Sequence, residues 1–358
     1  MIHPLAGADP ATLFGLLARH RVDAAHLPRL GLVLAIVLLR QPFSLAERVW
    51  IGRPPPPGQP PVFVVGHWRS GTTFLYELLS RDPGFAWLGP VAAGLPWDML
   101  LMARLLRPLL ERAVPKGRAI DRVPVTPHSP QEDEFALANM QGLSFLHGLS
   151  FPRHLAQEFR RGVFFDGATP AEVARWTEAM RLLVAKLSLA QGDRRALIKN
   201  PAHTARIALL AEMFPGAKFV HVHRNPFTVF QSMRRFHARL APMLALQRAD
   251  DAAVDSVILE TYRRMMEALI VQSAALPPDQ FAELSFEDLE REPLAALGGV
   301  YDRLGLPGFA QARPRFQAHL DARRDHVKNR WDLTPEVVDL VTAHWRPYLD
   351  RWRYAAPS

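Results

Sequence analysis

The chain has 358 residues, of which 49% are hydrophobic, enough to bury a large core in one domain or in one domain with additions. It carries 43 Lys and Arg against 35 Asp and Glu, and the net charge of +8 favours anionic partners: a phosphorylated cofactor, an acidic membrane or nucleic acid. It contains no cysteine, which excludes disulfides and cysteine-ligated metals.

Residues 1–52 are predicted to be helical, with a break near Pro28. They lack a basic start followed by an apolar core and a cleavage site, so we expect a cytoplasmic protein, with membrane association left open. The apolar run Leu30–Leu39 lies between two arginines and is too short for a span, which needs about 20 apolar residues. A buried helix explains this run, and so does a helix at residues 27–40 that lies on an acidic membrane surface.

A proline-rich segment at residues 53–61 follows. Consecutive prolines fix φ and remove backbone donors, so neither a helix nor a sheet can continue through them. We therefore predict an N-terminal helical appendage and linker at residues 1–58 and a main domain at residues 59–358.

The main domain alternates strand patterns with helix patterns. Short apolar runs rich in β-branched residues predict strands, and the apolar spacing i, i+3, i+4 predicts helices. Strands are expected at 62–65, 196–199, 218–223 and 281–286, and helices at 72–80, 130–140, 170–190, 204–213, from Pro226, and 287–304. This order predicts a parallel α/β sheet covered by helices on both faces.

The strongest functional signal is the turn Gly66–Thr73, which joins the first strand to the first helix of this domain. Two glycines five residues apart let backbone amides face a phosphate, and the following helix adds free N–H groups and the positive end of its dipole. The spacing matches a nucleotide-binding loop, but Thr72 stands where the usual lysine would be, and Arg69 supplies a cation instead. The missing lysine argues against a kinase or an NTPase.

A second block resembles the first in kind. Residues 219–226 run from a strand into a helix, with Arg224 at the strand end and Ser232 eight residues later. A second cationic pocket at a neighbouring strand end suits a cofactor with phosphates at both ends of adenosine, because a guanidinium binds phosphate bidentately.

Together the two blocks resemble the sulfotransferase superfamily, most closely its bacterial branch related to tyrosylprotein sulfotransferases. The resemblance covers about residues 60–330 and implies a P-loop-NTPase-like three-layer sandwich, with residues 59–358 as the sulfotransferase domain. It also implies 3′-phosphoadenosine 5′-phosphosulfate as co-substrate, with no metal. The residues that it assigns to this cofactor are Arg69, Ser70, Gly71, Thr72 and Thr73 at the 5′ end and Arg224 and Ser232 at the 3′-phosphate.

The resemblance also suggests residues for the transfer step. Lys199, at the end of the strand 196–199, matches a lysine that contacts the transferring group in the family. The acceptor must lose a proton, and Glu132 matches the base of members that use glutamate. Asp133 and His203 stay open as alternatives for the base.

Two further features lie near the predicted site. The basic segment 326–331 resembles one that closes over the 3′-phosphate, which makes Lys328 and Arg330 candidate cofactor ligands. His221 and His223 share one strand face and could ligate a metal, but no third ligand stands at a suitable spacing, so hydrogen-bonded histidines are favoured.

The resemblance implies a hydroxyl or an amine as the acceptor, and the apolar segment 85–125 favours a hydrophobic small molecule or a lipid. Two rival functions remain open at this point. The first is a nucleotide kinase or NTPase. The second is a non-catalytic basic protein that binds membrane or nucleic acid, although no nucleic-acid partner is expected.

Overall fold

The chain divides into two compact units, each described here by itself. Unit 1 comprises Met1–Gln59, Trp87–Ala196 and His237–Ala253, and unit 2 comprises Pro60–Ala86, Leu197–Phe236 and Val254–Ser358. In this computed structural model the described residues are 2–52, 54–105, 108, 126, 129–192, 194–248, 254–323 and 333–356.

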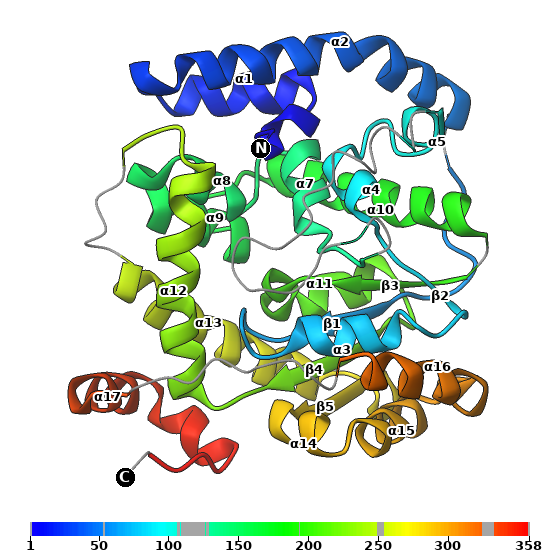
Figure 1. The fold of residues 1–358 in the computed structure, drawn as a ribbon, viewed down its shortest axis with the longest axis vertical. Helices are drawn as coiled ribbons and strands as arrows, with labels where there is room; N and C mark the ends of the chain where they lie inside the picture. Colours follow the sequence, from blue (N-terminus) through cyan, green and yellow to red (C-terminus); the bar gives the residue numbers. More distant parts are fainter. Residues whose placement is uncertain are drawn as a thin grey trace. The chain divides into compact units, whose positions relative to one another are not determined.

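Unit 2 is built on a five-stranded sheet with the strand order β2-β3-β1-β4-β5 (Figure 1). Strand β1 pairs in parallel with β3 and β4, and β4 pairs in parallel with β5. Each side chain of β1 is buried, which explains its continuous apolar sequence. The strands are β1 (Val62–Val65), β2 (Phe85–Ala86), β3 (Arg195–Lys199), β4 (Lys218–His223) and β5 (Phe281–Ser285).

Helices flank this sheet, so the predicted parallel α/β class is confirmed. Helix α3 packs on α16, α16 on α15 and α15 on β5, while α13 packs on α11 and α17. Helix α12 (Pro226–Leu244) begins in unit 2 and ends in unit 1. The other helical segments of unit 2 are α3 (Thr72–Leu79), η4 (Pro201–Ala205), α11 (Ile207–Met213), α13 (Val254–Ala274), η6 (Pro278–Gln280), α14 (Phe286–Arg291), α15 (Pro293–Leu304), α16 (Phe309–Asp321) and α17 (Pro335–Arg351).

One predicted helix of unit 2 is wrong as a single element. The segment expected to form one helix over 287–304 forms α14 and α15, which are separated at Glu292. Pro293 lacks an N–H group and disfavours helical geometry in the residue before it, so the first helix ends and the second begins there. The helix expected over 204–213 starts at Ile207, after the short helix η4.

Unit 1 is helical, and the break expected near Pro28 lies between α1 and α2. The Asp9 side chain caps α1 by accepting a hydrogen bond from Thr12 N at 2.7 Å. The helical segments of unit 1 are η1 (Pro4–Gly7), α1 (Pro10–Arg19), η2 (Ala24–His26), α2 (Leu27–Ile51), α4 (Pro90–Gly94), α5 (Met102–Leu105), α7 (Glu134–Met140), α8 (Leu146–Ser150), η3 (Pro152–His154), α9 (Leu155–Phe164) and α10 (Pro170–Gln191).

The N-terminal helices share a core with later parts of unit 1. Leu13 and Leu16 of α1 and Val33 and Val37 of α2 are buried in one cluster with Phe151. Residues 1–59 thus group with other segments of this unit. The division into an appendage at 1–58 and a sulfotransferase domain at 59–358 stays a prediction.

Candidate functional site

The turn after β1 passes too close to its neighbours to carry side chains at its two glycines. Gly66 has φ 141°, and a Cβ there would lie 2.4 Å from the carbonyl oxygen of Val222. Gly71 has φ 100°, and a Cβ there would lie 2.1 Å from the ring of Phe286. Both positions therefore need glycine, for backbone conformation and for space.

One hydrogen bond to a neighbouring segment and one within the turn hold the turn in place. The Gly66 amide donates to Thr204 Oγ1 at 2.8 Å, and the Ser70 amide donates to the His67 carbonyl at 3.1 Å. Between them, Arg69 takes the left-handed conformation at φ 69°, which is unusual for a residue with a side chain. The next element, α3, begins at Thr72, so its N-terminal end follows the turn directly.

The second predicted pocket lies against this turn. Arg69 Nε donates to Ser232 Oγ at 2.8 Å, and Arg224 Nη1 is 3.5 Å from the Arg69 carbonyl oxygen. Ser232 is buried on α12, and Arg224 is half-buried in the β4–α12 connection. Because β1 and β4 are paired in parallel, their carboxyl ends bring the two loops together. The structure thus places Arg69, Arg224 and Ser232 in one cluster.

Arg224 is packed on an aromatic ring that the sequence analysis did not select. Its guanidinium carbon lies 4.4 Å from the centre of the Phe286 ring, the same ring that contacts Gly71. Burial lowers the pKa of Arg224, and the carboxylates of Glu287 and Glu290 partly offset this effect. Phe286 was assigned to the end of a strand; the available signal was an aromatic residue at the point where a parallel strand ends.

Lys199 reaches the same turn from the other neighbouring strand. It is 1% exposed, it lies in register with Val64 of β1, and its Nζ donates to Thr73 Oγ1 at 3.2 Å. The three strand ends of β3, β1 and β4 therefore contribute a lysine, a glycine-framed turn and an arginine to one edge of the sheet.

The three candidate bases occupy different surroundings. Glu132 and Asp133 precede α7 in unit 1, where Glu132 is partly exposed and Asp133 is buried. The adjacent Glu134 accepts a hydrogen bond from Ser144 Oγ at 2.6 Å. His203 is buried in unit 2, with its ring edge-on to Phe63 at 5.8 Å between ring centres. The role of base stays a prediction for each candidate.

The paired histidines of β4 contact separate partners. His221 Nδ1 lies 2.9 Å from Glu283 Oε2, and His223 Nδ1 lies 2.9 Å from the Tyr354 hydroxyl. Burial lowers the pKa of His223 to about 4; burial alone would raise the pKa of Glu283, but the hydrogen bond and charge of His221 lower it to about 2. Among the residues described here, no three His, Asp or Glu side chains form a group suited to a metal ion.

Tyr354 links this histidine pair to the second turn. Its hydroxyl donates to Glu287 Oε2 at 2.8 Å, and Glu287 Oε1 accepts from the Asn225 amide at 3.1 Å. Asn225 in turn caps α12 by accepting a hydrogen bond from Phe227 N at 3.0 Å. The connection that carries Arg224 is therefore fixed on both sides.

Some predicted residues fall outside the described part of the chain. Lys328 and Arg330 belong to the segment 324–332, which is not described. Residues 106, 107 and 109–125 of the predicted acceptor wall at 85–125 are not described either. Their roles stay predictions.

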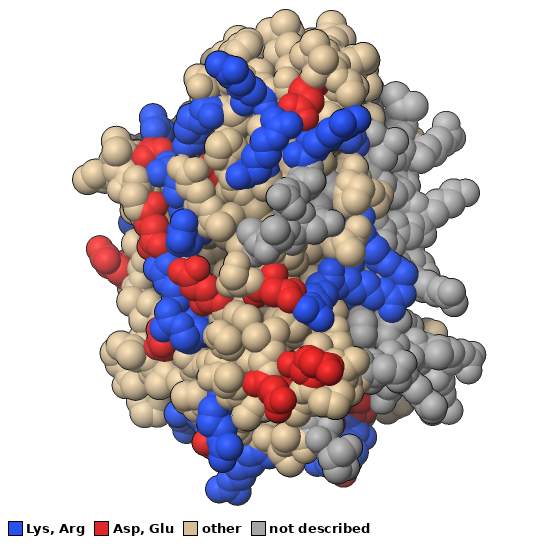
Figure 2. Space-filling view, turned by 90° about the vertical axis from the view of Figure 1, so that its left-hand side faces the viewer, with Lys and Arg blue, Asp and Glu red and all other residues tan. Residues whose placement is uncertain are grey.

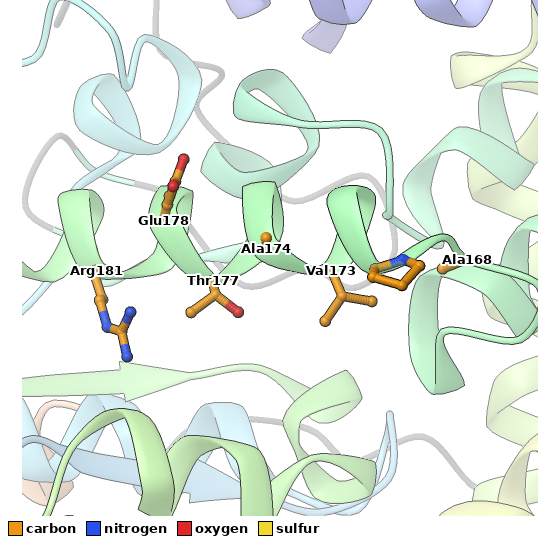
Figure 3. Close-up of a pocket in the computed structure, with 7 residues that line it drawn as sticks. Ala168, Val173, Ala174, Thr177, Glu178 and Arg181 are labelled. Atoms are coloured by element: carbon orange, nitrogen blue, oxygen red, sulfur yellow. The ribbon is translucent and has the colours of Figure 1, made fainter.

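A shallow groove of about 540 Å³ follows one side of α10 in unit 1 (Figure 3). Small apolar residues line it together with one acidic and one basic side chain. None of the sequence-predicted site residues lines this groove, so we assign it no role in the site. Its lining residues are Ala168, Pro170, Val173, Ala174, Thr177, Glu178 and Arg181.

Comparison with known proteins gives a consistent result. A family model described as "Sulfotransferase family" matches residues 60–311. Two relatives, from Mycobacterium bovis and Mycobacterium tuberculosis, are each 33% identical over 302 residues, which is 82% of this chain and 75% of the relative. Both are described as omega-hydroxy-beta-dihydromenaquinone-9 sulfotransferase Stf3.

Two crystal structures resemble this fold. Sulfotransferase STF9 from Mycobacterium avium has a TM-score of 0.69 at 20% identity, covering 96% of each chain. Sulfotransferase STF1 from Mycobacterium tuberculosis has a TM-score of 0.63 at 20% identity, covering 86% of this chain and 85% of the other. At this identity the likeness concerns the fold.

Proposed function

We propose a specific reaction for this chain, which belongs to the sulfotransferase family. In this reaction a sulfuryl group passes from 3′-phosphoadenosine 5′-phosphosulfate to a hydroxyl group on a hydrophobic, lipid-like acceptor. The observation that carries the proposal is the cluster of Arg69, Arg224 and Ser232 beside the turn framed by Gly66 and Gly71.

The residues of this cluster suit a doubly phosphorylated adenosine. The turn and the N-terminal end of α3 offer backbone N–H groups and a positive dipole end to the 5′-phosphosulfate, with Arg69 as the cation. Arg224 and Ser232 offer a guanidinium and a hydroxyl to the 3′-phosphate. The Arg69–Ser232 hydrogen bond makes the two sets neighbours, so one molecule can contact both. The half-buried ring of Phe286 adds a flat apolar surface between them.

The transfer step needs stabilisation of charge more than covalent chemistry. The acceptor oxygen forms a bond to sulfur while the bond from sulfur to the 5′-phosphate oxygen breaks, and 3′,5′-diphosphoadenosine leaves. Lys199, held 3.2 Å from the Thr73 hydroxyl at the turn, is placed to offset the negative charge on the bridging and transferring oxygens. The acceptor proton goes to a base, for which Glu132 is our first choice and Asp133 and His203 are the alternatives.

The nature of the acceptor is inferred from the relatives. The names of the two mycobacterial relatives specify a hydroxylated dihydromenaquinone, a hydroxyl on a hydrophobic molecule. The apolar composition of segment 85–125 predicts the same class of acceptor, a hydrophobic molecule. We include peripheral membrane contact through residues 27–40 and a cytoplasmic location in the proposal.

A nucleotide titration tests the proposed cofactor. We expect 3′,5′-diphosphoadenosine to bind more tightly than AMP, because only the former presents a phosphate to Arg224, and more tightly than ATP with or without Mg²⁺. Calorimetry on the full chain measures the three affinities. Preference for ATP would support a kinase or NTPase, and equal affinity for AMP and 3′,5′-diphosphoadenosine would remove the 3′-phosphate pocket.

A labelling experiment tests the transfer. The full chain is incubated with cofactor carrying radiolabelled sulfate and with extracted lipids or water-soluble proteins in separate reactions. We expect label in the lipid fraction. Label in proteins alone would contradict the proposed acceptor class, and no label in either would contradict the reaction.

A further inference from the structure

The polarity of helix α2 is reversed relative to an ordinary surface helix. An ordinary helix turns its apolar stripe to the core and its charged face to water. The buried positions of α2 carry charged and polar side chains next to two valines: Val33, Val37, Arg40, Ser44 and Glu47. Of its exposed residues only Arg48 is charged, and the others are Leu27, Pro28, Gly31, Leu32, Ala35, Leu38, Leu39, Pro42, Phe43, Leu45, Ala46, Val49 and Trp50.

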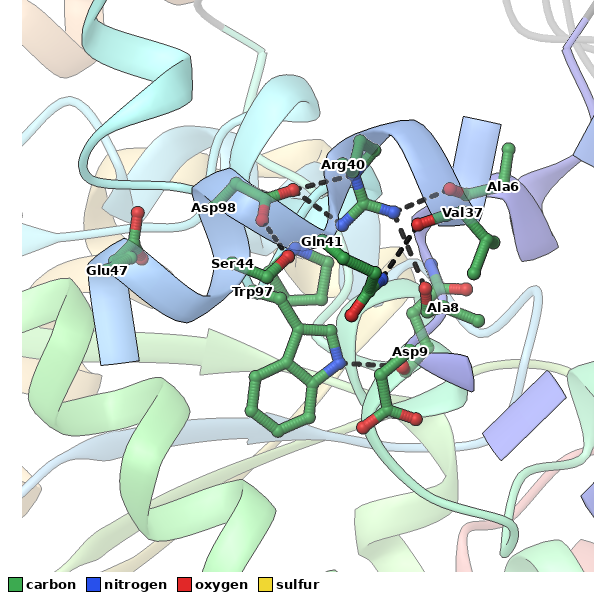
Figure 4. A network of polar contacts seen from close by, with 12 residues as sticks. Ala6, Ala8, Asp9, Val37, Arg40, Gln41, Ser44, Glu47, Trp97 and Asp98 are labelled. Carbon is green, nitrogen blue, oxygen red and sulfur yellow. Dashed lines mark hydrogen bonds and ion pairs between the residues drawn. The ribbon is translucent and has the colours of Figure 1, made fainter. Parts of the chain in front are cut away.

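Ion pairs hold the buried side chains of α2, called here its inner stripe, against the rest of unit 1. Figure 4 shows the pair formed by Arg40 and Asp98. Arg40 Nη2 lies 2.5 Å from Asp98 Oδ2, and Arg40 Nη1 donates to the Ala6 carbonyl at 2.6 Å. Glu47 Oε1 lies 2.5 Å from Lys186 Nζ, and its other oxygen accepts from two backbone amides that follow Asp98. Each of these charged groups is at most 4% exposed. The orientation of α2 about its own axis is therefore fixed, and its apolar side must face outward.

The outward side is large and continuous along the helix. Leu39 is 74% exposed, Val49 is 83% exposed and Trp50 is 64% exposed, while Leu32, Leu38 and Leu45 are each more than half exposed. Side chains of this size on a single helix face form a patch of the kind that marks an interaction site. Figure 2 shows the upper end of the molecule as a largely uncharged surface, with Lys and Arg side chains and an acidic group just below it.

Charge around this patch selects an anionic partner. Residues 2–52 contain three carboxylates, and each pairs with a cation: Asp9 with Arg48, Asp23 with Arg153, and Glu47 with Lys186. Arg21 and Arg29 stand at the N-terminal end of the patch, and Trp50 stands at the other end. An apolar helix face bordered by arginine and ended by tryptophan has the composition of a helix that lies in the interface of an acidic bilayer.

The inner stripe also decides between lying on a membrane and crossing it. Among the described helices, the segment Ala24–Ile51 is long and apolar enough to span a bilayer by length and composition. A spanning orientation would take Arg40 and Glu47 away from Asp98 and Lys186 and expose them to lipid, which is costly. Keeping both ion pairs leaves only the outward side for the membrane, so the helix lies parallel to the surface.

We propose that the outward face of α2, from Leu32 to Trp50, docks this enzyme on an anionic lipid bilayer. The inference rests on the proposed function, because a bilayer is where a lipid-like acceptor would be met. It goes beyond the sequence prediction in two respects. The footprint extends past residue 40 to the end of the helix, and the buried ion pairs are the device that turns the apolar side outward.

Vesicle flotation of the full chain tests the docking face. Vesicles are made of phosphatidylcholine alone or of phosphatidylcholine and phosphatidylglycerol in equal parts. We expect the chain to float with the mixed vesicles and to float less with neutral ones. The double variant Leu39→Glu, Val49→Glu should lower partitioning by about tenfold or more, since it removes two exposed apolar side chains that would enter the bilayer and adds two like charges at an acidic surface.

A control variant carries a Val→Glu substitution at an exposed position away from α2. Val271 on α13 is 72% exposed, so Val271→Glu introduces the same substitution at a comparable exposure in unit 2 and should leave flotation unchanged. Near-UV circular dichroism and thermal unfolding check that all variants are folded. Failure of the wild-type chain to bind mixed vesicles overturns the proposal, and so does equal loss in the double variant and the control.

A second copy of the chain is the competing occupant. Sedimentation velocity without vesicles detects it: a dimer that the double variant dissociates, together with no vesicle binding, would assign the face to self-association and overturn the proposal. The proposed function is checked separately, by 3′,5′-diphosphoadenosine affinity and by sulfuryl transfer to a short, water-soluble alcohol. If flotation is lost while nucleotide affinity and transfer to the short alcohol are retained, the docking proposal is contradicted and the proposed function stands. If the chain floats but does not bind 3′,5′-diphosphoadenosine, the proposed function is contradicted and the docking proposal stands.

Discussion

In unit 1 the guanidinium of Arg40 lies 2.5 Å from the carboxylate of Asp98, whereas in unit 2 the guanidinium of Arg224 contacts a carbonyl oxygen and the face of Phe286. Within the described part of the chain, Arg224 forms no ion pair with a carboxylate, although Glu287 and Glu290 act on its pKa. The protein itself neutralises the first cation. The second keeps positive charge at the surface of a turn that is shaped by two glycines.

This difference separates a charge that fixes the fold from a charge that we propose to serve a ligand. A buried ion pair is self-contained, and removing one partner leaves the other uncompensated. A half-buried cation packed on a ring and a backbone carbonyl gains its counter-charge when an anion binds. The two kinds of arginine should therefore respond to substitution in different measurements: unfolding for Arg40 and nucleotide binding for Arg224.

The largest effect is expected from breaking the ion pair of unit 1. Arg40→Met should lower the free energy of unfolding by about 3–5 kcal/mol, because it leaves the Asp98 carboxylate buried without its partner. Denaturant unfolding measures this loss. The double variant Arg40→Met, Asp98→Leu should recover much of it, since neither member of this pair is then left buried and charged without its partner. A single variant within about 1 kcal/mol of wild type would show that this pair does not fix α2.

The next largest effect concerns Lys199. Lys199→Ala should lower the rate of sulfuryl transfer by about 10²–10³-fold, because one preorganised donor to the transferring group is lost. Affinity for 3′,5′-diphosphoadenosine should change little, and single-turnover kinetics separates the two. Lys218→Ala is the matched control, since Lys218 lies on β4 and pairs with Asp279 at 3.3 Å. Unchanged turnover in Lys199→Ala would remove this lysine from the mechanism.

Arg224→Ala should act on cofactor discrimination. We expect it to weaken 3′,5′-diphosphoadenosine binding by about 10–100-fold while affecting AMP far less, because it removes charged hydrogen bonds to one phosphate. Calorimetry gives both affinities. Arg234 lies on the same helix α12 and pairs with Asp255, so Arg234→Ala should leave the preference intact. Equal losses for the two ligands in Arg224→Ala would place the 3′-phosphate elsewhere.

The sheet and its turns could be predicted from sequence because their signals are local. The apolar run at β1, the two glycines of the next turn and the Asn225–Pro226 start of α12 each lie within a few residues of the structure they produce. Parallel pairing then brings the ends of β3, β1 and β4 together. That pairing brings Arg69 and Ser232 close to each other, but no local pattern shows which of their atoms form the hydrogen bond.

The ion pairs of α2 and the contacts of the Phe286 ring could not be predicted, for a different reason. Arg40 and Asp98 are 58 residues apart, so no local pattern marks them as partners, and a charged residue in an apolar helix indicates a surface position by default. Phe286 belongs to the site only because α14 begins there and turns the ring toward Gly71. Pro293 could have predicted the end of that short helix.

Acidification should lower the free energy of unfolding through buried histidines in both units, so in this respect the two units do not differ. Burial lowers the pKa of His3 and His237 in unit 1 and of His223 and His319 in unit 2 to about 4, from an ordinary value of 6.5. Between these values the unfolded chain binds more protons than the folded chain, so the free energy of unfolding falls as the pH drops from 6.5 to 4. Each such histidine contributes at most about 1.4 kcal/mol per pH unit.

One histidine can be removed with little change in shape, and this gives the smallest predicted effect. His237 is 3% exposed and packs on Phe159 with 5.6 Å between ring centres, so His237→Phe replaces one buried ring with another. The unfolding free energy of the His237→Phe variant should fall less steeply than that of wild type between pH 6.5 and pH 4. The two slopes should differ by up to about 1.4 kcal/mol per pH unit. Denaturant titrations at several pH values measure this slope, and the value at pH 8 reports the packing change alone. A slope equal to that of wild type would mean that His237 gains a proton in the folded chain as readily as in the unfolded chain, and burial would not be the cause of acid sensitivity at this position.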